Sequence, residues 1–183
     1  YMSCASCHND GGHDGRVWDM TGFGEGLRNT ITLKGHAGNG SLHWSGNFDE
    51  VQDFENQIRN FAGGSGLIAD GTPNPPMGAS NAGRSADLDA LAAYVESLST
   101  HGASPARTAT GGLTAEAAEG EGIFRTQNCA SCHGGVNFTS SALDVFANIG
   151  TVKPATGQRL GGPLTGLDVP TLRGVWATAP YLH

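Results

Sequence analysis

The chain has 183 residues and a formal net charge of −7, and its ten Lys and Arg residues are scattered along the sequence. This balance argues against a nucleic-acid-binding protein, because contacts with phosphates need clustered basic side chains. No apolar run approaches the roughly 18 residues of a membrane span and no signal segment precedes Tyr1, so we expect a soluble chain that is already processed or excised.

The apolar inventory is thin for a chain of this length. Hydrophobic residues make up 38% of the sequence, aromatic residues 7%, and there are 29 glycines. A prosthetic group with large apolar faces would supply part of the missing core, and glycine-rich loops could approach such a group closely because glycine has no Cβ.

The five-letter word CASCH occurs at residues 4–8 and again at 129–133. A C-x-x-C-H word is typical of c-type haem attachment, in which both thiols bond to the haem vinyl groups and the next histidine becomes the proximal iron ligand. A zinc site of four cysteines and a set of disulfides are the alternatives, and neither needs the histidine. Because the histidine follows both times, we interpret the words as two covalent haem c sites, formed by Cys4, Cys7, His8, Cys129, Cys132 and His133.

Three helices are predicted, in chain order. Val51, Phe54, Ile58 and Phe61 fall at helical spacing within residues 49–61. Residues 86–98 carry an apolar stripe with a serine N-cap at position 85, and a third helix capped by Thr114 is acidic in its first turns and runs into the second CASCH word. Strand signals are poor throughout.

These elements predict a mainly α protein with two cytochrome c-like haem domains and long glycine-rich loops. We expect a first domain over residues 1–99, a linker rich in small and turn residues over 100–112, and a second domain over 113–183. The helix expected before the first haem word is missing, so we expect that the chain begins inside a domain.

The two halves resemble the bacterial di-haem cytochrome c peroxidase and MauG superfamily. Besides the CASCH words, the similarity rests on LRNT at 27–30, HWSGNFDE at 43–50 and the closing PTLRGVWATAPYLH at 170–183. The closing segment is the most specific, since it resembles the family pattern P-[ST]-L-R followed by T-A-P-Y-x-H. The first half is similar to the branch of the superfamily that carries HWxGNFDEVQDFE.

The resemblance implies roles for several residues. Trp44 corresponds to the tryptophan that passes electrons between the two haems, although a buried indole of the core is the alternative reading. Asn29, Thr178 and Pro180 match positions whose oxygens hold Ca²⁺ between the two halves, and a hard cation suits carbonyl and amide oxygens. Ordinary loop residues are the alternative at these three positions.

The sequence departs from the family at the peroxide-binding iron. Peroxidases of this family place an acid–base glutamate in a motif like N-P-x-E-M-G, whereas residues 74–78 read NPPMG, with Pro76 in the place of the glutamate. Glu50, Glu55 or Gln57 could substitute from the preceding helix, or form its solvated face. The second haem usually takes a methionine or tyrosine from beyond the closing motif, but the sequence stops at His183. We expect either that the second domain is truncated there or that this ligand comes from elsewhere.

The function of each haem depends on its sixth ligand, because two strong ligands favour electron transfer and an open position admits substrate. The candidates are His43, His36, Met20, Met77 and His183, together with the weaker candidates His13 and His101. Surface histidines and a methionine that plugs the core are the alternatives.

The resemblance therefore implies a cytochrome that moves electrons between two haems and reduces hydrogen peroxide at one of them. Two alternatives stay open: a non-enzymatic electron carrier or subunit of an electron-conducting assembly, and a module cut from a longer protein. Small redox proteins, further copies of the chain or a larger redox complex are the expected partners. Haem attachment outside the cytoplasmic membrane predicts a periplasmic or extracellular location.

Overall fold

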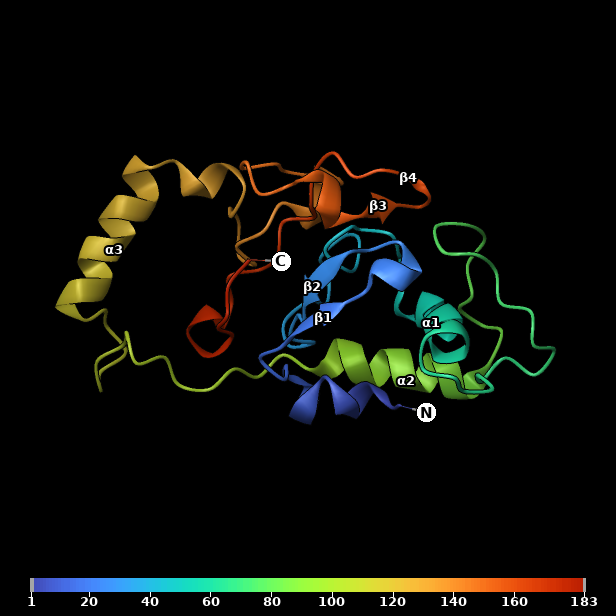
Figure 1. Cartoon of the computed structure of the whole chain (residues 1–183). Helices are drawn as coiled ribbons and strands as arrows, with labels where there is room; N and C mark the ends of the chain where they lie inside the picture. The colour runs from blue at the N-terminus through green and yellow to red at the C-terminus, as the bar shows by residue number, and fades with distance from the viewer. Residues whose placement is uncertain (1, 183) are drawn as a thin grey trace.

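The computed structural model describes residues 2–182. Its helices are α1 (Phe54–Asn60), α2 (Ala86–Ser97) and α3 (Ala115–Thr126). The strands form two antiparallel pairs, β1 (Val17–Asp19) with β2 (Leu27–Asn29) and β3 (Gln158–Arg159) with β4 (Gly162–Pro163). In Figure 1, α1 and α2 lie near the β1–β2 pair, whereas α3 lies at the opposite end of the molecule.

The prediction of a mainly α protein is wrong. Within residues 2–182 the three α-helices have only 7, 12 and 12 residues, and the remaining helical segments are eight 3-10 turns of three residues each. Seventeen of the 29 glycines have positive φ, a conformation that ends helices and shapes turns. The sequence also shows little sign of strands, yet two antiparallel pairs form. The strands of β1–β2 have three residues each and those of β3–β4 have two.

Helix α2 is formed as predicted. The hydroxyl of Ser85 accepts a hydrogen bond from the amide of Leu88 at the N-terminus. Leu88 is 0% exposed and Ala92 is 3% exposed, so the apolar stripe faces the core. The other fully apolar members of this core are few: Phe48, Val51, Ile68, Leu164, Leu167 and Val169.

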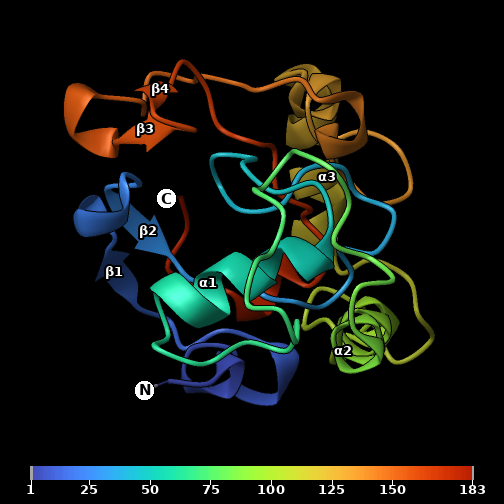
Figure 2. The same cartoon turned by 90° about the vertical axis from the view of Figure 1, so that its right-hand side faces the viewer.

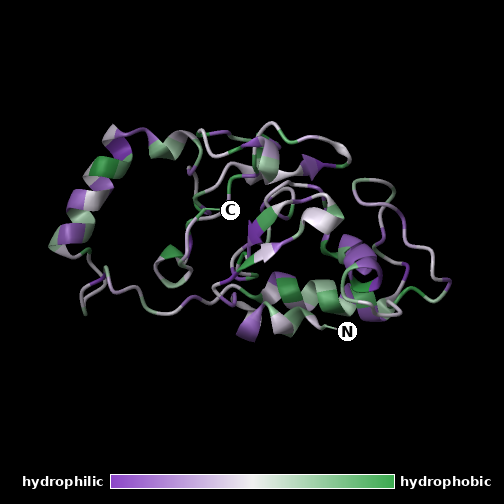
Figure 3. Ribbon diagram, viewed as in Figure 1, coloured by the Kyte–Doolittle hydropathy of each residue, from purple (hydrophilic) through white to green (hydrophobic). Residues whose placement is uncertain are grey.

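Helix α1 is shorter than the predicted segment 49–61, because its first residues, Val51–Asp53, form a 3-10 turn. Helix α3 has the predicted cap, with the Thr114 hydroxyl accepting from the amide of Ala117, yet none of its residues is buried. Figure 3 shows apolar residues along both α2 and α3, although only α2 buries any of them.

The C-terminal segments return onto the N-terminal part of the chain. Arg159 donates to the carbonyls of Ser45 and Gly46, both at 2.8 Å, and the amide of Gln158 donates to the carbonyl of Gly24 at 2.7 Å. Figure 2 accordingly shows the β3–β4 hairpin beside the β1–β2 hairpin. Across residues 2–182, no helix combines the length and the apolar character needed to span a bilayer.

Candidate functional site

The two CASCH words fold in the same way. Each forms one 3-10 turn, Cys4–Ser6 and Cys129–Ser131. The amide of the histidine that follows then donates to the carbonyl of the first cysteine, at 2.8 Å for His8 and 2.9 Å for His133. The repeated sequence therefore presents two thiols and one imidazole in the same local arrangement twice.

Both histidines are held through Nδ1. His8 Nδ1 lies 3.2 Å from the carbonyl oxygen of Gly12, and His133 Nδ1 lies 3.2 Å from the carbonyl oxygen of Phe138. A carbonyl only accepts, so Nδ1 carries the hydrogen in each ring and Nε2 keeps its lone pair. This is the arrangement of a metal-ligating histidine oriented by a backbone carbonyl.

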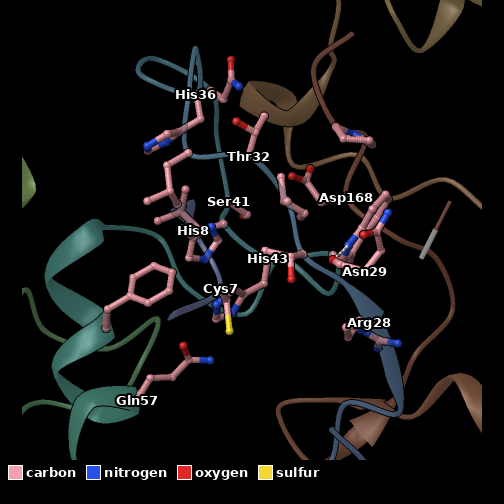
Figure 4. A pocket seen from close by; sticks show the side chains of 18 of the residues that line it. Cys7, His8, Arg28, Asn29, Thr32, His36, Ser41, His43, Gln57 and Asp168 are labelled. Atoms are coloured by element: carbon pink, nitrogen blue, oxygen red, sulfur yellow. Dashed lines mark hydrogen bonds between the residues drawn. The ribbon is translucent and has the colours of Figure 1, made fainter. Parts of the chain in front are cut away.

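A cavity of about 220 Å³ opens beside the first CASCH turn (Figure 4). Cys7 and His8 lie on its wall, while Cys4 is exposed and does not line it. Burial lowers the pKa of His8 and raises the pKa of Cys7. Most of the rest of the wall is apolar and includes Ile31, Leu33, Leu42, Val51, Phe54, Phe61 and Val95.

A second, larger cavity of about 590 Å³ lies beside the second CASCH turn. Cys129, Cys132 and His133 line it. Its apolar wall includes Ala147, Ile149, Leu167, Leu172, Val175 and Leu182.

The two cavities share one wall. Residues 29–32, Trp44 and residues 168–171 line both of them. Trp44 is fixed in this wall, because its indole Nε1 donates to the carbonyl of Asn29 at 2.8 Å and its own carbonyl accepts from the amide of Asp168 at 2.8 Å. The indole thus stands between two cavities that each contain a cysteine–histidine word.

The donor sets fit haem better than the alternatives. All four cysteines are free thiols, so the disulfide reading has no support. Over residues 2–182 no group of three or more His, Cys, Asp or Glu side chains has the arrangement of a metal site. A covalently attached haem requires two thiols and an oriented imidazole beside an apolar cavity. Both thiols and the imidazole line the second cavity, whereas Cys7 and His8 alone line the first.

The candidate sixth ligands separate by position. Met20, His36 and His43 line the first cavity, and Met77 lines neither cavity. The Nε2 atom of His36 is buried and makes no hydrogen bond among residues 2–182. Burial lowers the pKa of both His36 and His43. His183 lies outside the described residues.

Two weaker candidates lie elsewhere. His13 Nε2 is 2.8 Å from the carbonyl oxygen of Ala177. The ring of His101 lies between Gly35 and Gly174, where a Cβ on either glycine would come within 2.6 Å of a ring nitrogen. Neither histidine lines either of the two cavities described above.

Of the side chains considered as replacements for the missing acid, only Gln57 lines the first cavity. Glu55 is 0% exposed and accepts from Arg59 at 2.8 Å and from the amides of residues 67 and 68, so it holds a loop together. Glu50 accepts from the Ser80 hydroxyl at 2.7 Å and from the amide of Asn81. Both carboxylates are structural in this arrangement.

An acidic residue that the sequence analysis missed does line the first cavity. Glu25 accepts from the Ser45 hydroxyl at 2.7 Å and from the Asn47 amide at 2.8 Å, and Arg28 lies 3.2 Å from its other oxygen. Asn47 in turn lies 2.7 Å from Nδ1 of His43. No linear motif joins these residues, because the chain turns back between β2 and the segment 43–47 to bring them together.

Asp168 is a second missed carboxylate, and it lies in the shared wall. Its Oδ2 atom accepts from the Ser141 hydroxyl at 2.7 Å, whereas Oδ1 is buried with no hydrogen-bond partner among residues 2–182. Burial, and to a smaller extent the nearby Asp144, raise the pKa of Asp168 to about 6.

The residues considered for Ca²⁺ come close together. The Asn29 amide donates to the carbonyls of Pro180 and Leu182, and Oδ1 of Asn29 is buried without a partner among residues 2–182. The Thr178 hydroxyl instead donates to the carbonyl of Val175 at 3.2 Å. Asn29 and Pro180 are therefore in contact, the side chain of Thr178 is used locally, and the Ca²⁺ site stays a prediction.

The chain is similar to two known proteins over nearly its whole length. It is 28% identical to hydrazine synthase subunit gamma of Kuenenia stuttgartiensis, over 99% of the chain and 60% of that protein. It is 29% identical to the cytochrome c peroxidase Ccp of Escherichia coli, over 100% of the chain and 45% of that protein. The chain thus spans about half the length of the curated relatives it matches. No family model matches it.

Two solved structures share the fold. Hydrazine synthase of Kuenenia stuttgartiensis has a TM-score of 0.67 at 21% identity, covering 99% of this chain and 67% of that one. A MauG-like protein associated with microbial copper homeostasis has a TM-score of 0.59 at 22% identity, covering 100% of this chain and 63% of that one. These structures show the shared fold. The sequence relatives support a haem protein of the cytochrome c peroxidase and MauG-like kind with covalently bound haem c. The narrower branch carrying HWxGNFDEVQDFE stays a prediction.

Proposed function

We propose that the chain is a di-haem c-type cytochrome of the peroxidase and MauG type, which moves electrons between two covalent haems. One haem would be attached at Cys4 and Cys7 and the other at Cys129 and Cys132, with His8 and His133 as proximal ligands. A haem so attached supplies one-electron redox chemistry. The observation that carries this proposal is the shared wall, because Trp44 lines both cavities.

Trp44 serves as the electron relay between the two centres in this proposal. Its support is geometric: the indole is anchored at Nε1 by Asn29 and at its backbone by Asp168, so its position relative to both cavities is set by two separate segments. A fixed relay avoids the cost of reorganising the side chain each time an electron passes.

The first cavity is the proposed place of hydrogen peroxide reduction. It combines an apolar wall with the polar side chains of Gln57, His43 and Glu25, which is the usual composition of a small-molecule site. Gln57 could orient peroxide by a hydrogen bond but carries no acid–base function. With peroxide reduced in this cavity, the chain would be an oxidoreductase.

One observation favours a second candidate, a non-enzymatic electron carrier. Met20, His36 and His43 all line the first cavity, and any one of them bonded to the iron would close it to substrate. In that case the chain would serve as an electron-transfer protein or as a subunit of a conducting assembly, with the same Trp44 relay.

Several accompanying proposals follow from the same reading. Asn29, Thr178 and Pro180 would hold Ca²⁺ through amide and carbonyl oxygens. A periplasmic or extracellular location fits the site of haem attachment. Small redox proteins would donate or accept the electrons, and further copies of the chain or a larger redox complex are the other partners. Neither nucleic acid nor a membrane span has a part in this proposal.

Intact-mass measurement tests the central claim. We expect two haem-sized additions on the full chain and sharp Soret and α bands after reduction. Electron paramagnetic resonance of the oxidised protein then decides between the two candidates, because one open, high-spin iron supports the peroxidase and two six-coordinate, low-spin irons support the carrier. A mass equal to that of the bare polypeptide would refute both.

A further inference from the structure

We propose that His43 is the proton-transfer residue of the first cavity, held in its working tautomer by a chain of hydrogen bonds through Asn47 to Glu25. The inference rests on the proposed function, and it identifies the group that replaces the glutamate missing at Pro76. Hydrogen peroxide is the substrate that would bind in this cavity.

The tautomer of His43 follows from the carboxylate at the far end of the chain. Glu25 accepts at both oxygens: Oε1 from Ser45 and Asn47, and Oε2 from Arg28. The Asn47 amide nitrogen must therefore face Glu25, and its carbonyl oxygen faces Nδ1 of His43. A carbonyl oxygen only accepts, so Nδ1 carries the hydrogen and Nε2 keeps a lone pair.

The rest of the surroundings fix the ring and leave Nε2 available. The His43 ring packs against Phe48 and Phe54, with ring centroids 4.5 and 4.8 Å apart. No side chain or backbone group within residues 2–182 hydrogen-bonds to Nε2. His43 also has φ of +66°, an uncommon conformation for a residue other than glycine and one that is found at functional sites.

His43 enters the cavity from a different segment than the proposed proximal ligand. Figure 4 shows His8 and His43 near the centre of the cavity, with Gln57 of α1 on one side. Pro76 and the structural carboxylates Glu50 and Glu55 do not line it. Apart from the proposed proximal ligand His8, His43 is thus the histidine among the described cavity-lining residues that has a hydrogen-bonded Nδ1 and a lone pair on Nε2.

The proposed step conserves atoms and charge. His43 Nε2 would accept the proton from one oxygen of hydrogen peroxide. It would return that proton to the other oxygen as the O–O bond breaks. That second oxygen leaves as water and takes the bonding electron pair with it. A haem held in this cavity would supply the one-electron redox chemistry. Overall, two electrons, delivered one at a time by a small redox protein, and two protons from solvent would convert one hydrogen peroxide to two waters.

Ligand binding by the haem-loaded full chain tests this role without relying on turnover. Hydrogen cyanide must lose its proton when it binds ferric iron, so a base in the cavity accelerates its association. We expect His43→Leu to slow cyanide association about a hundredfold, the lower end of what a positioned acid–base group supplies. Asn47→Ala should give a smaller loss, because the ring stays present and loses only its orientation.

Asn60→Ala, at the exposed end of α1, is the matched control and should leave the rate unchanged. Haem content and the electron paramagnetic resonance spectrum are recorded for every variant. If His43→Leu fails to load haem, the Asn47→Ala rate decides, since its side chain only positions the ring.

Unchanged rates in a haem-loaded His43→Leu protein would overturn the inference while the proposed function stands. It would also fall if His43→Leu turned a low-spin iron into a high-spin one and accelerated cyanide binding, because His43 would then be an axial ligand. A wild-type chain without haem would instead remove the proposed function itself.

Discussion

At the scale of single residues, Asp168 is the group whose surroundings match its charge least. It is 9% exposed, one of its oxygens has no hydrogen-bond partner within residues 2–182, and Asp144 adds a second negative charge nearby. The Ser141 hydroxyl and the amide of Val169 compensate only in part. Folding therefore raises the pKa of this carboxyl, which lies in the wall that both cavities share.

This preference predicts a pH dependence of stability. The pKa of Asp168 is about 6 in the folded chain against an ordinary value of 3.8, so folding is accompanied by proton uptake between these pH values. The stabilisation is complete below about pH 4 and is lost as the pH rises through 6. Two pK units correspond to roughly 3 kcal/mol at most.

Asp168→Asn should therefore raise the free energy of unfolding relative to the wild type at pH 7, and lose that advantage near pH 4. Denaturant titrations across this range measure the difference. Asp87→Asn, on the exposed face of α2, is the control and should show no such trend. A constant difference between Asp168→Asn and the wild type at every pH would contradict the prediction.

The residues that could be predicted from the sequence are those whose chemistry is local. The CASCH words predict their own turns, because the amide of each histidine bonds within the word. Glu25 and Asp168 could not be predicted, since their importance comes from partners at positions 45–47 and 141 that only the fold brings near. Glu50 and Glu55 were considered as acid–base residues because the sequence does not show their structural partners. Those partners lie in loops without a recognisable pattern.

At the scale of elements, α3 stands out because it buries nothing. A helix of 12 residues is marginal in water without packing. Its C-terminus leads directly into the second CASCH turn, which begins at Cys129. If haem is attached there, its apolar faces are the natural packing partner of α3.

This dependence predicts that α3 loses protection when the second haem cannot attach. In a protein carrying both Cys129→Ser and Cys132→Ser, we expect the α3 amides to exchange hydrogen at least tenfold faster than in the wild type. Amides of α2 act as the control in the same experiment, because Leu88 and Ala92 anchor that helix in the protein core. Equal exchange of α3 in the two proteins would show that it needs no haem.

The helices themselves were predictable, but the balance of the fold was not. Ser85 and Thr114 are N-caps as expected, and the stripe that includes Leu88 is buried. The prediction of a mainly α protein was wrong because helical periodicity identifies the helices but says nothing about the long segments between them. The glycine-rich loops take their shape from contacts with distant parts of the chain, such as Gly26 against Thr156 and Gly40 against Ser141.

At the scale of the whole molecule, the C-terminal end of the described chain meets β2. Asn29, at the end of that strand, binds the carbonyls of Pro180 and Leu182 and receives the Trp44 indole on its own carbonyl. One residue thus joins the closing segment to the wall between the cavities. Anything that tightens this junction should stabilise both parts of the molecule together.

Calcium is the proposed agent of that tightening. Rotating the Asn29 amide would place Oδ1, now buried without a partner among residues 2–182, beside the carbonyl oxygens of Pro180 and Leu182, and a hard cation favours such a set. A site that binds only the folded chain stabilises it by about 2.7 kcal/mol at a free ion concentration of a hundred times Kd.

We therefore expect the thermal midpoint of the haem-loaded chain to fall on chelation and to recover with added Ca²⁺. Asn29→Leu should abolish the response, because it removes the amide oxygen while keeping the side chain similar in size. Asn60→Ala should retain it. Calorimetric titration with Ca²⁺ measures the affinity directly. A chelated protein with an unchanged midpoint would mean that the Asn29–Pro180 hydrogen bond alone closes the junction.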